Sequence, residues 1–95
     1  MAGDYSEIER SKALLAQSQQ ALIDFLSIDT EVGLTFLSMA RTATEPVRAR
    51  SLIEKARIAI RSIRHLAERI EDRNMRKTIH DRVNTLDEDV NAFSN

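Results

Sequence analysis

The first residues to consider are the two histidines, because imidazole can transfer protons near neutral pH and can bind metals. His65 and His80 are the only histidines among the 95 residues, and Glu68 follows His65 by three positions. That spacing places both side chains on one face of a helix. A di-iron carboxylate bundle needs a glutamate three residues before a histidine on each of two helices. The order here is reversed and unpaired, so we expect no metal and no cofactor.

A second motif consists of Arg73 and Asn74, followed by five residues and then His80. This pattern resembles the signature of the HEPN-domain ribonucleases, an all-helical family. The resemblance implies a metal-independent cleavage of RNA, in which the histidine handles a proton and the arginine stabilises phosphate charge. Arg73 and His80 are therefore the candidate catalytic pair. We nevertheless expect a protein that is not an enzyme, because two residues alone do not define an active site.

Basic side chains are concentrated in the middle of the chain. Residues 1–40 carry a formal charge of −4, residues 41–82 carry +6, and residues 83–95 carry −3. Arginine outnumbers lysine by eleven to three, a bias that suits bidentate pairing with carboxylate or phosphate. The segregation of charge predicts that the basic middle pairs with the acidic ends.

Arg57, Arg61 and Arg64 share one face of a predicted helix and form the candidate binding face. We expect this face to be solvated and paired locally, Glu54 with Arg57 and Glu68 with Arg64. Nucleic-acid binding through the same arginines is the alternative. It is disfavoured by a pI near 6.1 and by the lack of aromatic residues between positions 36 and 93. The polar faces also lack the lysines and aromatic anchors of membrane-binding helices, so we expect no membrane contact.

The elements that must position these side chains are all helical, because no strand pattern occurs. Helices are predicted over about 5–27, 30–43, 45–71 and 74–93. Ser27 or Asp29 can cap the second of these helices, over 30–43. The alternative is a single helix over 5–43. Pro46 suits a first helical turn, with Thr44 before it as the cap. The predicted fold is an all-α, up-and-down antiparallel bundle of three to four helices.

Apolar side chains recur at helical spacing in every predicted helix. In the segment 30–43 we expect Val32, Phe36, Met39, Ala40 and Ala43 to face the core. The stripe of the helix 45–71 is broad, and that of the helix 74–93 is close to a heptad seam from Met75 to Phe93.

Together these stripes offer more apolar surface than the helices of one monomer are expected to bury. This excess favours a protein–protein interaction module that forms a homo-oligomer. Leu15, Leu22 and Phe93 are the candidate interface residues, because they lie near the ends of the bundle.

A second resemblance covers about half of the chain. It consists of the run of residues 29–40, DTEVGLTFLSMA, followed by the segment 50–63 with Glu54-Lys55-Ala56-Arg57. This order of a leucine-threonine-phenylalanine helix and an arginine-rich helix resembles a group of small bacterial helical proteins of no assigned activity. The resemblance implies a bacterial helical bundle and adds nothing about chemistry.

Length and composition bound the remaining possibilities. Ninety-five residues allow one domain over 1–95, in which residues 1–17 carry few apolar side chains and are expected to pack loosely. Cysteine is absent, which excludes disulfides and thiolate chemistry. No secretory signal and no run of about 18 apolar residues is present. A cytoplasmic location is therefore expected.

Overall fold

The structure is a computed structural model that describes the backbone of residues 2–94 and the side chains of residues 10, 13 and 17–94. Three helices make up this part of the chain: α1 (Ala2–Thr42), α2 (Pro46–Ala67) and α3 (Arg73–Ser94). The described residues contain no strand. The all-helical prediction is confirmed, whereas the prediction of separate helices over 5–27 and 30–43 is wrong.

Helix α1 continues without a break through the predicted boundary at residues 27–30. The hydroxyl of Thr30 donates a hydrogen bond of 2.8 Å to the carbonyl oxygen of Leu26, one turn earlier, and its side chain is buried. A threonine that satisfies its hydroxyl in this way can remain inside a helix. Polar side chains at 27, 29 and 30 therefore did not end the helix, and the alternative of one long helix describes the chain correctly.

Helix α2 begins with Pro46 at its first position, as predicted, because proline loses no intrahelical hydrogen bond there. The residue at the N-cap position is Glu45, and its side chain makes no capping hydrogen bond. The prediction of Thr44 as the cap is therefore wrong. Helix α2 also ends at Ala67, four residues before the predicted end, because the chain turns through residues 68–69 and buries Ile70 in the core.

The connection between α2 and α3 is held by Gln19, which lies about fifty residues earlier in the chain. The Gln19 amide nitrogen donates to the carbonyl oxygen of Arg69 at 3.1 Å, and its oxygen accepts from the backbone N–H of Glu71 at 2.9 Å. Asp72 then caps α3, because its carboxylate accepts from the backbone N–H of Met75 at 2.9 Å.

The core lies where the C-terminal part of α1 meets the other two helices. Its buried apolar side chains are Leu26, Leu37 and Ala40 of α1, Leu52, Ile53, Ala56, Ile60, Ile63 and Ala67 of α2, Ile70 of the connection, and Ile79, Val83, Leu86 and Val90 of α3. The predicted stripes of α2 and α3 are thus largely confirmed. The predicted core face of 30–43 is wrong for Val32 and Met39, which are exposed.

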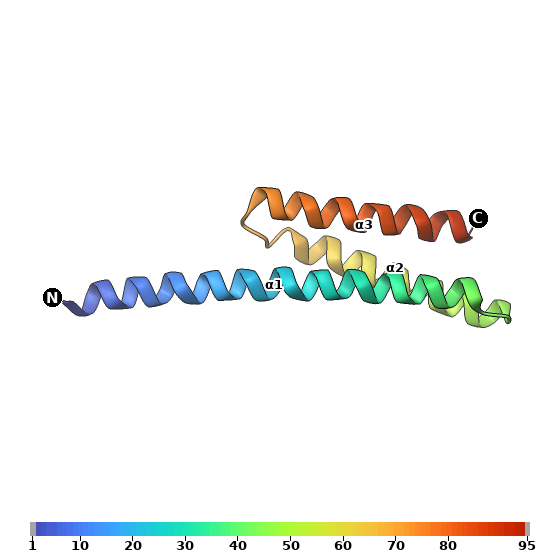
Figure 1. Cartoon of the computed structure of the whole chain (residues 1–95), viewed down its shortest axis with the longest axis horizontal. Coiled ribbons are helices and arrows are strands. Elements are labelled where there is room, and N and C mark those ends of the chain that lie inside the picture. Colours follow the sequence, from blue (N-terminus) through green and yellow to red (C-terminus); the bar gives the residue numbers. More distant parts are fainter. Residues whose placement is uncertain (1, 95) are drawn as a thin grey trace.

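Polar contacts between α2 and α3 follow one order. Glu68, which directly follows α2, contacts His80, Arg64 contacts Asp87, and Arg57 contacts Ser94. Residue numbers therefore increase along α3 as the numbers of their partners decrease toward the start of α2. Figure 1 shows α2 folded back along α1, with α3 beside both. The N-terminal part of α1 extends past the other helices, and the molecule measures 67 × 20 × 15 Å.

Among the described residues, no helix is both long and apolar enough to span a lipid bilayer.

Candidate functional site

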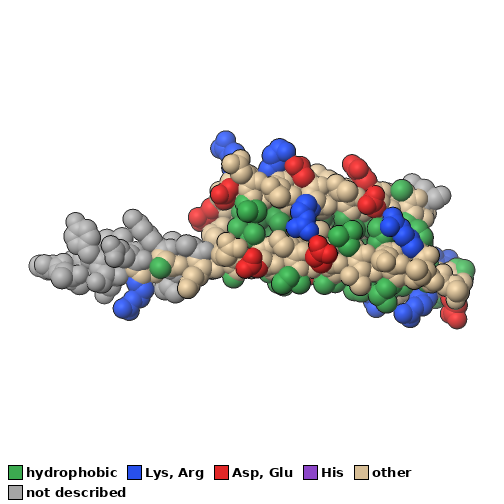
Figure 2. Space-filling model, viewed as in Figure 1, with side chains coloured by type: hydrophobic (Ala, Val, Ile, Leu, Met, Phe, Trp, Pro, Cys, Tyr) green, Lys and Arg blue, Asp and Glu red, His purple; other side chains and the backbone are tan. Residues whose placement is uncertain are grey.

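The most unusual surface of the molecule is a row of exposed apolar side chains on α1. It consists of Phe25, Ile28, Val32 and Met39, which we call the outer stripe. Phe25 is 49% exposed and Ile28 is 62% exposed, values more typical of polar surface residues than of large apolar ones. Figure 2 shows hydrophobic side chains along the edge of the molecule formed by α1, on the side away from α3.

Two apolar patterns coexist on α1, and each advances by alternating steps of four and three residues. The inner pattern occupies positions 26, 30, 33, 37 and 40, and its side chains are buried against α2 and α3. The outer pattern occupies positions 21, 25, 28, 32, 35 and 39 and includes the outer stripe. A helix with two such seams can pack against two sets of neighbours. The bundle supplies neighbours for the inner pattern only.

The inner pattern depends on a small residue at Gly33. A Cβ atom added there would lie 2.7 Å from Cδ2 of Leu86, which is a buried residue of α3. Glycine therefore lets α3 approach α1 closely. Since small and polar residues stand at positions 30 and 33, the inner pattern is hard to recognise from hydrophobicity alone. For this reason apolar spacing alone predicts Val32 and Met39 as core residues instead.

The two sides of α1 differ in their polar contacts. On the side toward α2, the ammonium of Lys55 lies 5.9 Å from the centroid of the Phe36 ring, a cation–π distance. On the side toward α3, Arg82 donates to a carboxylate oxygen of Glu31 at 3.2 Å. The outer stripe lies between these two edges. Leu34 is on a different face, because the nine residues that separate it from Phe25 amount to two and a half helical turns.

The three arginines of the candidate binding face have different surroundings. Arg64 is half-buried and donates to Asp87 at 3.1 Å and to Asn84 at 3.0 Å. Arg57 donates to the hydroxyl of Ser94 at 2.8 Å. Arg64 and Arg57 are therefore occupied in joining α2 to α3.

Arg61 is more exposed and lies 3.6 Å from a carboxylate oxygen of Glu54. The predicted local pairs Glu54 with Arg57 and Glu68 with Arg64 do not form. Glu54 pairs instead with Arg61, about two turns further along α2, and Arg57 contacts Ser94 of α3.

The candidate catalytic pair is not brought together within the chain. Nε2 of His80 lies 2.9 Å from a carboxylate oxygen of Glu68. Arg73 is exposed at the start of α3, seven residues before His80, which corresponds to about 10 Å along the helix axis. Among the described side chains, no hydrogen bond or ion pair joins Arg73 to His80. The observed contact of His80 is structural, because it ties α3 to the end of α2.

The candidate interface residues lie in three different settings. The side chain of Leu15 falls outside the described residues. Leu22 is half-buried and packs against the core cluster. Phe93 is 38% exposed and lines a pocket at the end of α3. Leu22 and Phe93 therefore belong to different surfaces, and neither is part of the outer stripe.

Lys77 on α3 has a pKa that differs from its ordinary value. A hydrogen bond from Lys77 to Asp81 at 2.8 Å, together with the negative charge of this carboxylate, raises the pKa of Lys77 above its ordinary value of 10.5. Both side chains are exposed. This contact is an ordinary surface ion pair one turn apart on α3.

Within the described residues, no cluster of three or more histidine, aspartate or glutamate side chains is arranged to hold a metal ion. Comparison of the chain with models of protein families, with curated proteins and with solved structures finds no match.

Proposed function

We propose that this chain is a non-enzymatic helical interaction module that associates with a second copy of itself through the outer stripe of α1. The observation that carries the proposal is the exposure of Phe25, Ile28, Val32 and Met39 in one row. In the proposed arrangement the monomer is an up-and-down antiparallel bundle of three helices. Its inner α1 pattern stabilises the monomer, and its outer pattern is reserved for the partner.

The size of the outer stripe fits this role. Each of its four side chains is at least 39% exposed, so the stripe exposes on the order of a few hundred Å² of apolar surface, a size at which surface patches are often functional. Burial of the stripe against a second copy removes about twice that area from water. With polar flanks included, the contact approaches the lower end of specific interfaces. We expect a dimer of about micromolar affinity, because small interfaces bind weakly.

Two variants that introduce a charge test the proposal against a matched control. Ile28→Lys and Val32→Glu each place a charge in the outer stripe. Leu34→Glu places a charge on a different face of α1, at a residue with the same 39% exposure as Val32. In light scattering over a dilution series, the unmodified chain and Leu34→Glu should form dimers, whereas the two stripe variants should remain monomers.

High salt should leave the dimer intact, because salt screens the attraction between charges and not the burial of apolar side chains. If the unmodified chain stays monomeric at every concentration, self-association is wrong. A parallel series with single-stranded RNA tests the alternative of nucleic-acid binding. A mass increase only with RNA, and only at low salt, would move the functional surface to Arg57, Arg61 and Arg64.

A further inference from the structure

A pocket of about 590 Å³ lies between the first half of α2 and the last turn of α3. Its lining residues are Pro46, Ala49, Arg50, Ile53, Glu54, Arg57, Phe93 and Ser94. The volume is in the range of small-molecule sites. None of these residues belongs to the outer stripe, so a ligand in this pocket would bind independently of self-association.

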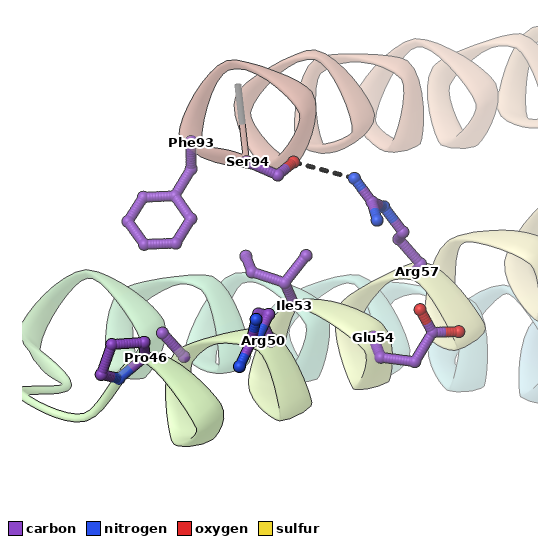
Figure 3. Close-up of a pocket in the computed structure, with 8 residues that line it drawn as sticks. Pro46, Arg50, Ile53, Glu54, Arg57, Phe93 and Ser94 are labelled. Carbon is purple, nitrogen blue, oxygen red and sulfur yellow. Dashed lines mark hydrogen bonds between the residues drawn. The ribbon is translucent and has the colours of Figure 1, made fainter.

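One side of the pocket is apolar. Figure 3 shows the ring of Phe93 extending from α3 toward α2, with Ile53 rising from α2 beside it. Ile53 is buried, whereas Phe93 keeps over a third of its surface exposed. With Pro46 and Ala49, these side chains form a wall that an aliphatic or aromatic group can cover. Such a group would remove the exposed part of the Phe93 ring from water.

The other side of the pocket carries an excess of positive charge. Arg57 reaches across to Ser94, as Figure 3 shows, and this 2.8 Å bond uses only one of its five N–H donors. Arg50 lies two turns earlier on α2, at the pocket rim. Glu54 is the one carboxylate among the described lining residues, and it lies 3.6 Å from Arg61, which is outside the pocket. Among the described residues, neither Arg50 nor Arg57 has a carboxylate within ion-pair distance.

The start of α2 adds to the positive potential of the pocket. Helix α2 has no acidic residue in its first turn, and Glu45 provides no side-chain cap. The N-terminal end of the helix dipole is positive, and the charge of Glu45 at the N-cap position offsets part of it. Pro46 and Ala49 of this first turn line the pocket directly. Together with Arg50 and Arg57, the end of the helix favours a negatively charged group.

We infer that this pocket binds a small amphiphilic carboxylate, with its carboxylate between Arg50 and Arg57 and its apolar body against Ile53 and Phe93. Guanidinium groups match the planar geometry of a carboxylate. The apolar wall then selects a carboxylate with an aliphatic or aromatic body over a fully hydrated small anion. Binding consists of non-covalent contacts only.

The test uses octanoate as the probe and octanamide as its neutral analogue, followed by amide chemical shifts in NMR spectra of the full chain. Octanoate should shift the signals of Ala49, Ile53 and Phe93, and octanamide should bind at least about tenfold more weakly because it lacks the charge. Equal binding of both compounds, or shifts confined to the outer stripe, would overturn the inference. So would the absence of any shift.

Matched variants separate a specific site from general charge attraction. Arg57→Gln and Arg50→Gln should each weaken octanoate binding by about tenfold. Arg48→Gln removes the same charge from an exposed residue outside the pocket lining, and it should leave binding unchanged. Arg50→Gln breaks no hydrogen bond of the described structure, so its result remains interpretable if Arg57→Gln disturbs α3. An equal effect of all three variants would contradict the assignment.

Discussion

At the scale of single residues, Gly33 determines how closely α1 and α3 pack. Gly33→Ala raises helix propensity, which by itself favours folding by about 1 kcal/mol. The added Cβ would meet Leu86 at 2.7 Å. Because Leu86 is buried in a close-packed core, we expect overpacking to outweigh the gain and to destabilise the monomer by about 1 kcal/mol.

Chemical denaturation measures this change, and a double-mutant cycle with Leu86→Val identifies its cause. In the Leu86→Val background, which provides room for the new methyl group, Gly33→Ala should be neutral or stabilising. An equal loss in both backgrounds would show that the contact with Leu86 is not the reason.

Gln19 is the second residue whose effect depends on tertiary contacts. Gln19→Ala removes both hydrogen bonds to the α2–α3 connection and should lower the free energy of unfolding by about 1–2 kcal/mol. The Glu71 amide should also exchange its hydrogen faster. Gln20→Ala is the matched control, because among the described side chains Gln20 bonds to Asp24 on the same helix. Similar losses in both variants would refute the role of Gln19 as a long-range clamp.

At the scale of elements, the continuity of α1 is the main departure from sequence-based expectation. Amide hydrogen exchange checks it directly, because a helix boundary at residues 27–30 would leave amides without intrahelical acceptors. We expect the amides of residues 27–31 to be protected about as strongly as those of residues 37–40. A local drop in protection at residues 27–31 would restore the two-helix alternative.

On helix α3, the ion pair of Lys77 makes a prediction about pH. Since the pKa of Lys77 is raised in the folded chain, its ion pair with Asp81 favours folding below the unfolded value of 10.5 and is lost as pH rises through the folded value. Asp81→Asn should therefore lower the Lys77 pKa toward 10.5. An NMR titration measures the shift, and an unchanged Lys77 pKa would exclude Asp81 as its cause.

At the scale of the whole molecule, self-association should couple to stability. If only folded chains associate into the dimer, the melting temperature must rise with protein concentration. We expect a rise of several degrees across a dilution series for the unmodified chain, and none for Val32→Glu. Calorimetry or circular dichroism provides the measurement. A concentration-independent melting temperature for the unmodified chain would contradict self-association through the folded state.

Much of the architecture followed from local patterns. The stripes of α2 and α3 have regular apolar spacing, and Pro46 marks a helix start through its own covalent geometry, so neighbours were not needed to interpret them. The candidate site was less predictable. Apolar spacing predicts a core position for Val32 and does not distinguish Phe25 and Ile28, because hydrophobicity does not show which of two seams finds a partner.

The sequence by itself determined that the chain is helical, that its core is aliphatic, and that its basic residues collect in the middle of the chain, over residues 41–82. Only the tertiary structure decided which face of α1 is buried, because that choice depends on Gly33 and Thr30 meeting the other helices. It also decided the contacts of Arg57 and Arg64, which cross to α3 instead of pairing along α2. Helical spacing is local, whereas the partner of each face depends on residues distant in the chain.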